Sequence, residues 1–413
     1  MGDFTTSIFE KLKEIVLNLC SSRRNSGENE KFCDRCSGVR NTGTCAGKEN
    51  GSCCCNPDGL PSPLCVYYSP RIMYLLNGEK TEFDTAREHW TVLDPQSVRE
   101  AEMIADENRK YFDEVLAKHP EWGAFFTRYQ HLEVGEKLGE GAQAEIFAAS
   151  FPRMGNTRMK GKPNLVAKVW KEGVSLKHLE RQWPREVMSK LSQGSKQWPF
   201  KNISGGVYIR EGGFKNRFAF VMRRFTCDLR AYIDRQMLEL FEKKSHGPPF
   251  KDIQNVYSVL YSAATDLEEL HQAGVVHRDI KASNILTRAG VGGESFLIDY
   301  ECSVGVIGTG FWRAPEILEQ VQKRVPSSEL VFTKKADIYS FGMMCYEMVT
   351  GCIPFEGHPQ NDYSIVLRGE RPHLPEDLNS DLKNIIEQCW DQDPLSRPSA
   401  SELVRKFDFS ELI

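Results

Sequence analysis

The segment Val276–Leu286 constrains this chain more than any other part of the sequence. Apolar residues alternate there with polar ones whose types are unusual for a simple surface loop. The polar positions that stand out are His277, Arg278, Asp279, Lys281 and Asn284. Five fixed residue types arise by chance on the order of once in three million starting positions at uniform residue frequencies. The segment therefore predicts a loop that carries chemistry.

Two earlier segments lie among short strand-like runs. Gly139–Ile146 is a glycine-rich turn, and Gly139 and Gly141 would let the backbone approach a phosphate group closely. Leu165–Trp170 is an apolar strand with a single lysine, Lys168, which is costly there unless its ammonium meets an anion. Taken alone, the first is better explained as a hairpin turn, and the second is equally well explained as an edge residue that reaches water.

A carboxylate follows shortly after the loop. Two apolar runs flank a turn rich in glycine between Asn284 and Asp299, which is typical of a β-hairpin. Closure of this hairpin would bring Asn284 and Asp299 together at its open end, near Asp279. Carboxylate and amide oxygens suit a hard cation that carries phosphates.

Taken together, these motifs resemble those of the eukaryotic protein kinases, and most closely the plant tyrosine-kinase-like group of serine/threonine kinases. Further segments match in the same order and at fitting spacing. They are Gly308–Glu316, Asp337–Gly342 and Cys389–Pro398. The resemblance covers about residues 132–409. It implies transfer of the γ-phosphate of ATP to Ser/Thr hydroxyls of protein substrates, with ATP and Mg²⁺ as cofactors.

The order of strand-like and helical stretches and the resemblance to kinases both predict an α+β fold. Strand-like runs come first and helical stretches follow from about residue 252, which indicates two lobes. The resemblance implies a kinase domain at 131–409, with an antiparallel β N-lobe at 131–225 and a helical C-lobe at 226–409. A Cys-rich and helical extension precedes it, divided into 1–65 and 66–130.

The resemblance also implies roles for the catalytic residues. Asp279 is expected to accept the proton of the substrate hydroxyl, and Lys281 to steady the transferring γ-phosphate. Lys168 is expected to contact the α- and β-phosphates and to pair with Glu186. Glu186 is chosen over Glu180 because Pro184 would break a helix centred on Glu180.

The same resemblance implies the residues that bind Mg·ATP. Asn284 and Asp299 are expected to hold Mg²⁺, whose charge offsets that of the phosphoryl oxygens. The residues expected around the nucleotide are Leu138, Gly139, Gly141, Ala144, Ile146, Val166, Lys168, Met222 and Leu286. Glu316 and Arg397 are expected to form a buried ion pair in the helical lobe.

The chain departs from the family pattern after Asp299. Tyr300 and Glu301 follow where the family has Phe and Gly, and Glu301 lacks the easy access of glycine to positive φ. We expect a stiffer loop that seldom flips outward, with metal binding through Asp299 retained. Ala144 also stands where the family usually has glycine, which slightly crowds the phosphate turn.

Acceptor type and activation are predicted less directly. Lys281 and Thr309 resemble residues of Ser/Thr-directed members of the family. Arg278 usually pairs with a phosphate on the loop that follows Asp299, and Ser303 is the best candidate for it. Activity without loop phosphorylation is an equal alternative.

A second function remains open from the sequence. The chain could be a pseudokinase scaffold, or a Cys-rich interaction protein, that binds nucleotide without efficient transfer. The presence of Lys168, Asp279, Asn284 and Asp299 argues against this, because a degenerate enzyme usually lacks one of them.

The N-terminal extension is distinguished by its cysteines. Eight of the 13 cysteines fall in the first 65 residues, and an all-thiolate zinc site built from Cys33, Cys36, Cys53 and Cys55 is one interpretation of residues 33–65. Disorder is the favoured alternative, because the spacing of the second pair is atypical. The helix expected from Asp94 to Lys118 is expected to dock on the small lobe.

Location and partners follow from charge and hydropathy. The 53 basic and 57 acidic residues give a net charge of −4, which predicts no nucleic-acid partner. We expect a cytoplasmic protein, because no apolar run is long enough to span a membrane and charged residues interrupt the N-terminal segment. Weak membrane contact through the amphipathic stretch 8–20, with Cys20 acylated or Gly2 myristoylated, is an alternative to its packing on a protein. No oligomeric state is predicted.

Overall fold

The structure is a computed structural model, and twelve stretches of the chain are described. They are 95–127, 130–141, 143–150, 165–176, 203–225, 227–243, 245, 247–287, 295–300, 308–326, 329–359 and 362–408. The stretch 8–20, the cysteines of residues 33–65, and the residues Glu186, Glu301 and Ser303 lie outside them. In the described stretches, no helix is long and apolar enough to cross a membrane.

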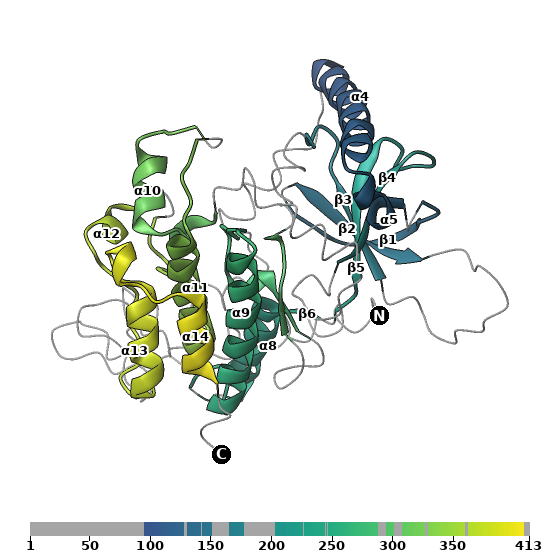
Figure 1. Cartoon of the computed structure of the whole chain (residues 1–413). Coiled ribbons are helices and arrows are strands. Elements are labelled where there is room, and N and C mark those ends of the chain that lie inside the picture. Colours follow the sequence, from purple (N-terminus) through teal and green to yellow (C-terminus); the bar gives the residue numbers. More distant parts are fainter. Residues whose placement is uncertain are drawn as a thin grey trace, which may run out of the picture.

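The small lobe is built on a five-stranded antiparallel sheet in the order β1-β2-β3-β5-β4 (Figure 1). The strands are β1 (Glu133–Glu140), β2 (Ala144–Ser150), β3 (Leu165–Trp170), β4 (Ile203–Ile209) and β5 (Arg217–Arg223). The strand predicted at Leu165–Trp170 is β3, and the predicted glycine-rich turn connects β1 to β2. The sequence did not predict β4.

The two faces of this sheet bury different clusters. Residues opposite each other on antiparallel strands share a face. One face carries Phe147, Ala167, Val169, Val207, Ala219 and Val221, which form a small core of their own. The other face carries Lys168 and Trp170 of β3, with Phe218, Phe220 and Met222 of β5. The aromatic rings of this second face belong to the main hydrophobic core.

The helix α4 (Pro95–Lys118) covers part of this second face (Figure 1). Its Phe112 ring stacks on Tyr208 at 5.5 Å between centroids and lies 5.8 Å from Phe218. Phe112 and Val115 are both almost fully buried. The expected docking of this helix on the small lobe is therefore confirmed.

A short 3-10 turn, η1 (Pro120–Trp122), leads into the helix α5 (Gly123–Thr127), which contacts β4. Phe126 of α5 lies so close to Gly206 that a Cβ atom there would be 2.6 Å from its ring. Glycine is therefore required at this position of β4, because no other residue leaves room for the ring.

The large lobe contains the remaining elements. Its helices are α8 (Leu229–Glu242), α9 (Ile253–Gln272), α10 (Pro315–Gln322), α11 (Lys334–Thr350), α12 (Ser364–Leu367), α13 (Ser380–Cys389) and α14 (Ala400–Phe407). A three-stranded sheet joins β6 (Cys227–Asp228), β7 (Ile285–Thr287) and β8 (Ser295–Leu297). Short 3-10 turns are η3 (Ala282–Asn284), η5 (Gly310–Trp312) and η6 (Pro394–Ser396).

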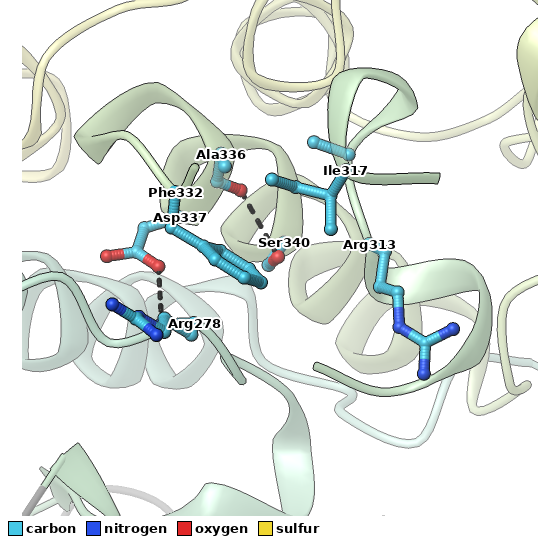
Figure 2. A pocket seen from close by; sticks show the side chains of 8 residues that line it. Arg278, Arg313, Ile317, Phe332, Ala336, Asp337 and Ser340 are labelled. Atoms are coloured by element: carbon cyan, nitrogen blue, oxygen red, sulfur yellow. Dashed lines mark hydrogen bonds between the residues drawn. The ribbon is translucent and has the colours of Figure 1, made fainter. Parts of the chain in front are cut away.

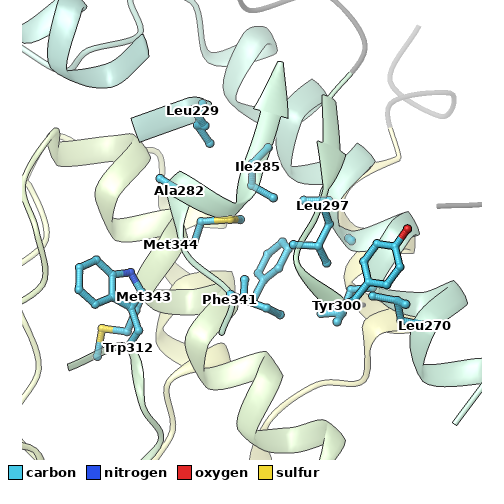
Figure 3. Close-up of a cluster of buried hydrophobic side chains, with 14 of the residues drawn as sticks. Leu229, Leu270, Ala282, Ile285, Leu297, Tyr300, Trp312, Phe341, Met343 and Met344 are labelled. Carbon is cyan, nitrogen blue, oxygen red and sulfur yellow. The ribbon is translucent and has the colours of Figure 1, made fainter. Parts of the chain in front are cut away.

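The helix α11 forms the centre of the large lobe. Every residue from Ala336 to Thr350 is buried, which explains why the helix is apolar on all sides. Phe341 and Met344 lie among side chains from the segment Val276–Leu286 and from β8 (Figure 3). The core of the lobe therefore continues directly into the residues of the kinase-like motifs.

The expected ion pair between Glu316 and Arg397 is present and is bidentate. The two guanidinium nitrogens of Arg397 lie 2.8 and 2.9 Å from the two carboxylate oxygens of Glu316. The Arg397 side chain is fully buried, whereas that of Glu316 is 26% exposed. Arg397 also donates to the backbone oxygens of Lys335 and Asp391.

We predict that Glu316→Ala lowers the stability of the large lobe by about 3 kcal/mol, because it leaves a buried guanidinium without its counter-charge. Chemical denaturation followed by tryptophan fluorescence measures this. Glu370→Ala is the control, since it removes an exposed pair with Arg368 and should cost less than about 1 kcal/mol. Equal losses in the two variants would contradict the prediction.

Candidate active site

Lys168 and Asp299 meet across the two lobes. The Nζ atom of Lys168, in β3, lies 2.8 Å from Oδ1 of Asp299, although the residues are 131 positions apart. Partial burial of Asp299 tends to raise its pKa, but the Lys168 ammonium, aided by His277 and Lys281, holds the pKa below the usual value. An ammonium from the central strand of the small-lobe sheet and a carboxylate of the large lobe are thus held together.

The hairpin expected between Asn284 and Asp299 is confirmed at both of its strands. Ile285 of β7 pairs with Leu297 of β8, and the backbone N–H of Ile298 donates to the oxygen of Asn284 at 2.9 Å. Asn284 and Asp299 therefore flank the open end of the hairpin, as the turn chemistry predicted.

Asp279 is the centre of a hydrogen-bond network. The hydroxyl of Thr309 donates to Oδ1 of Asp279 at 2.6 Å, and the Nζ atom of Lys281 lies 2.8 Å from Oδ2. Lys281 also donates to the Thr309 hydroxyl at 2.6 Å. The amide nitrogen of Asn284 donates to the backbone oxygen of Asp279 at 2.7 Å. These contacts fix the carboxylate and the lysine relative to each other.

The buried carboxylate of Asp337, in α11, fixes the backbone before Asp279. It accepts hydrogen bonds from the N–H groups of His277 and Arg278, both at 2.8 Å. The ring of His271 lies 2.9 Å from the same carboxylate. Arg278 and Asp299 both have positive φ, 71° and 73°, which is a strained conformation that persists only where the surroundings hold it.

The side chain of Arg278 lies against an aromatic ring. Its guanidinium carbon is 5.0 Å from the centre of the Phe332 ring (Figure 2). The Nε atom is buried and has no hydrogen-bond partner in the described part of the chain. Burial lowers the pKa of Arg278, with a smaller opposing effect from Asp337. Ser303 is not described, so loop phosphorylation and activity without it both remain predictions.

The residues predicted around the nucleotide fall into two groups. Ile146, Val166 and Met222 share the sheet face of Lys168, since Ile146 is opposite Lys168 and Val166 is opposite Met222. Leu286 lies on β7 in the large lobe.

The remaining predicted positions belong to the glycine-rich turn between β1 and β2. Leu138 is 38% exposed near the end of β1. The N–H of Gly141 donates to the oxygen of Ala144 at 2.7 Å, which closes the turn. Ala144 itself is buried at the start of β2, opposite Trp170.

One contributor to the site was missed in the sequence. Glu347, in α11, accepts from the N–H of Ala282 at 2.9 Å and from the indole N–H of Trp312 at 2.8 Å. It also lies 3.3 Å from Arg230. Burial raises the pKa of Glu347, and Arg230 opposes that effect. The available signal was a single carboxylate inside the otherwise uncharged run from Ile338 to Thr350.

The chain belongs to the protein tyrosine and serine/threonine kinase family. The sequence profile of that family matches residues 132–407, which is well over half of the chain. This agrees with the resemblance noted in the motifs and with the two-lobed fold. Family membership implies the use of ATP and Mg²⁺ in general.

Similar proteins that are named as protein kinases support the same family. The chain is 26% identical over 340 residues to the serine/threonine/tyrosine-protein kinase HT1 of Arabidopsis thaliana, which covers 79% of this chain and 75% of the relative. It is 32% identical over 223 residues to a light-sensor protein kinase of Ceratodon purpureus, and this match covers 48% of this chain and 17% of the relative. It is 27% identical over 187 residues to the serine/threonine-protein kinase STY17 of Arabidopsis thaliana, and this match covers 43% of this chain and 31% of the relative. The chain thus spans less than a third of the length of the last two relatives.

The donor set is compatible with Mg²⁺. The Nδ2 group of Asn284 donates to Asp279, so its oxygen Oδ1 is the atom that a cation could take. Asp299 adds a carboxylate whose lowered pKa keeps it ionised near neutral pH. Among the described residues, no group of three or more His, Cys, Asp or Glu is placed to hold a metal ion. The cysteines of the zinc hypothesis lie outside those residues, so it stays a prediction.

We predict that Lys168→Met makes the protein less sensitive to acid. A carboxyl whose pKa is lower in the folded state stabilises the fold above its unfolded pKa, and this stabilisation is lost as the pH falls. Without the ammonium, burial is opposed only by the weaker effects of His277 and Lys281, so the pKa of Asp299 rises. The melting temperature of the wild type should therefore fall more steeply than that of the variant below about pH 5.

Thermal unfolding at several pH values measures this difference. Lys323→Met is the control, because Lys323 is 73% exposed, pairs with Glu319 and does not contribute to the pKa of Asp299. Parallel curves for the wild type and Lys168→Met would contradict the prediction.

Proposed function

We propose that the protein is an active protein kinase that transfers the γ-phosphate of ATP to serine and threonine hydroxyls of protein substrates. The observation that carries this proposal is the 2.8 Å contact between Lys168 and Asp299 beside the hydrogen-bonded group of Asp279, Lys281 and Thr309. All the charged groups that the family template requires, apart from Glu186, are described and are brought to one place.

Asp279 is the proposed catalytic base. Its carboxylate is anchored by Thr309 and Lys281, so it can receive a proton from a substrate hydroxyl without first reorganising. Lys281 places a positive charge beside that carboxylate, where it would offset charge on the group being transferred. Both residues come directly after the backbone segment that Asp337 holds in place.

Lys168, Asn284 and Asp299 are the proposed ligands of Mg·ATP. Lys168 would contact the α- and β-phosphates and pair with Glu186, which lies outside the described residues. Asn284 and Asp299 would hold the cation, which supplies charge stabilisation for phosphoryl transfer when it is bound. Leu138, Gly139, Gly141, Ala144, Ile146, Val166, Met222 and Leu286 are proposed to line the nucleotide.

Serine/threonine acceptors are favoured by the contacts of Lys281. Its ammonium links Asp279 to the hydroxyl of Thr309, and this arrangement occupies the space next to the base. HT1 is named a serine/threonine/tyrosine kinase, so tyrosine acceptors are part of the test.

We also propose that the protein acts in the cytoplasm, and that any membrane contact is weak and made through the N-terminal segment. The balance of 53 basic and 57 acidic residues supports the absence of strong electrostatic binding to anionic surfaces. The N-terminal segment and its cysteines lie outside the described residues.

We predict that Asp279→Asn abolishes transfer of labelled γ-phosphate to peptide libraries with fixed Ser, Thr or Tyr acceptors. A fall of at least about 100-fold is expected, because amide nitrogen and oxygen cannot accept the hydroxyl proton. Binding of Mg·ATP should remain within about threefold of the wild type, since Asp279 contacts only Asn284 and Lys281 among the residues proposed to bind the nucleotide and its cation.

The outcomes separate the two functions considered. Transfer to Ser and Thr by the wild type and not by Asp279→Asn supports the proposal. Binding of Mg·ATP by a wild-type protein that transfers no phosphate would indicate a scaffold instead. Transfer that is unchanged in Asp279→Asn would refute the role given to this residue.

A second prediction concerns Thr309. Thr309→Val should lower kcat by roughly tenfold, because it removes one hydrogen bond to Asp279 and one from Lys281. Thr309→Ser keeps the hydroxyl and should retain most of the activity, which makes it the matched control. Steady-state kinetics with the best Ser/Thr peptide measure both. Equal kcat values for the two variants would contradict the prediction.

A further inference from the structure

The helix α4 buries one polar side chain within its apolar stripe. The stripe that faces the small lobe runs through Ala101, Ala105, Asn108, Phe112 and Val115, at the spacing of one helix face. Asn108 is only 9% exposed. A buried amide is costly unless its donor and acceptor are both satisfied, so its partners indicate what it does.

Both partners of Asn108 belong to the short segment that follows β3. Its Nδ2 group donates to the oxygen of Val174 at 2.8 Å, and its Oδ1 accepts from the N–H of Leu176, also at 2.8 Å. One side chain thus makes two backbone hydrogen bonds, as a neighbouring strand would. The segment Lys171–Leu176 is tied to a helix nearly 70 residues earlier in the chain.

The same segment is joined to the glycine-rich turn at its other end. The N–H of Lys171 donates to the oxygen of Gln143 at 2.9 Å. Arg217 donates a hydrogen bond to the backbone oxygen of Trp170, the residue before Lys171, at 2.6 Å, and Arg217 also pairs with Glu145 at the start of β2. The position of the segment therefore influences the turn that is proposed to bind phosphates.

Lys171–Leu176 has little packing on one side. A cavity of about 460 Å³ lies between α4, this segment and the loop between β4 and β5. The lining from the segment includes Lys171, Gly173, Val174 and Leu176. Leu176 is buried in the main core and Val174 packs against it, and the two hydrogen bonds of Asn108 add a direct polar link between the segment and α4.

The sheet face links this contact to Lys168. Trp170 lies two residues after Lys168, so both side chains project from the same face of β3. The Trp170 ring contacts Phe218 at 4.7 Å and Phe220 at 5.3 Å, and Phe220 lies opposite Lys168. A shift of the strand end would thus change the place of Lys168 as well as that of the turn.

We propose that Asn108 is a positioning residue for ATP: by fixing Lys171–Leu176 to α4 it sets the geometry of the glycine-rich turn and of Lys168. This inference rests on the proposed kinase function. It assigns the accessory helix a part in nucleotide affinity, and not only in stability. Asn108 itself touches neither the nucleotide nor the substrate.

The test compares three variants of the full chain with the wild type. Asn108→Leu keeps the volume and removes both hydrogen bonds. Asn108→Asp keeps the acceptor for Leu176 and loses the donor to Val174, and it serves if the leucine variant does not fold. Asp113→Leu is the control, because it breaks the exposed contact of α4 with Arg210 and leaves Lys171–Leu176 untouched.

The first readout is amide hydrogen exchange, which needs no catalytic activity. In Asn108→Leu we expect exchange to rise by roughly tenfold in Lys171–Leu176 and also in Gly139–Ala144, with a smaller rise in Asn108→Asp. Asp113→Leu should leave both segments as in the wild type. Faster exchange in Lys171–Leu176 alone, with Gly139–Ala144 unchanged, would overturn the proposal.

The second readout is kinetic. Asn108→Leu should raise the KM for ATP roughly tenfold while the KM for the peptide changes less than twofold, which loss of stability alone would not produce. An equal rise in both constants, or an unchanged KM for ATP, would overturn the proposal. If the wild type transfers no phosphate, the dissociation constant of Mg·ATP replaces KM. The proposed function would then fail, and a tenfold weaker affinity would still support the role of Asn108.

Discussion

The active-site loop depends on two buried carboxylates of one helix. Asp337, near the start of α11, accepts the backbone N–H groups of His277 and Arg278, and Glu347, near its end, accepts that of Ala282. The loop between these points carries the proposed base. Because α11 is buried from Ala336 to Thr350, neither carboxylate can move without disturbing the core. The strained backbone at Arg278 is held in place by these contacts, and the hydrogen bonds around Asp279 can form only when the loop has this shape.

In the small lobe, one sheet face serves two purposes. The part near β3 and β5 presents Lys168 and Met222 toward the proposed nucleotide site, and the part near Tyr208 and Phe218 accepts α4. Trp170 joins these two parts, since its ring contacts those of Phe218 and Phe220. The arrangement makes the accessory helix part of the same packed layer as the lysine, and this proximity gives a physical basis for coupling between them.

The sequence identified the residues that meet at the candidate site better than the residues that support them. Lys168, Asp279, Asn284 and Asp299 were identified because each sits in a motif whose residue types and spacing are rare, and the described geometry brings them together. The strand β4 was not predicted, since Gly205 and Gly206 lower its strand propensity, and the reason for Gly206 is the ring of Phe126 from a distant helix. Asn108 and Glu347 were missed for a similar reason: their partners lie far away in the chain, and local patterns do not reveal them.

The close fit of α4 and α5 has a practical consequence for recombinant work. The boundary predicted from the sequence would start a kinase-domain fragment at residue 131. Such a fragment would leave the rings of Tyr208 and Phe218 without the side chains that cover them. Newly uncovered aromatic surface of this kind promotes self-association in solution. Expression should therefore begin upstream of Pro95, so that both helices remain attached to the sheet that they shield.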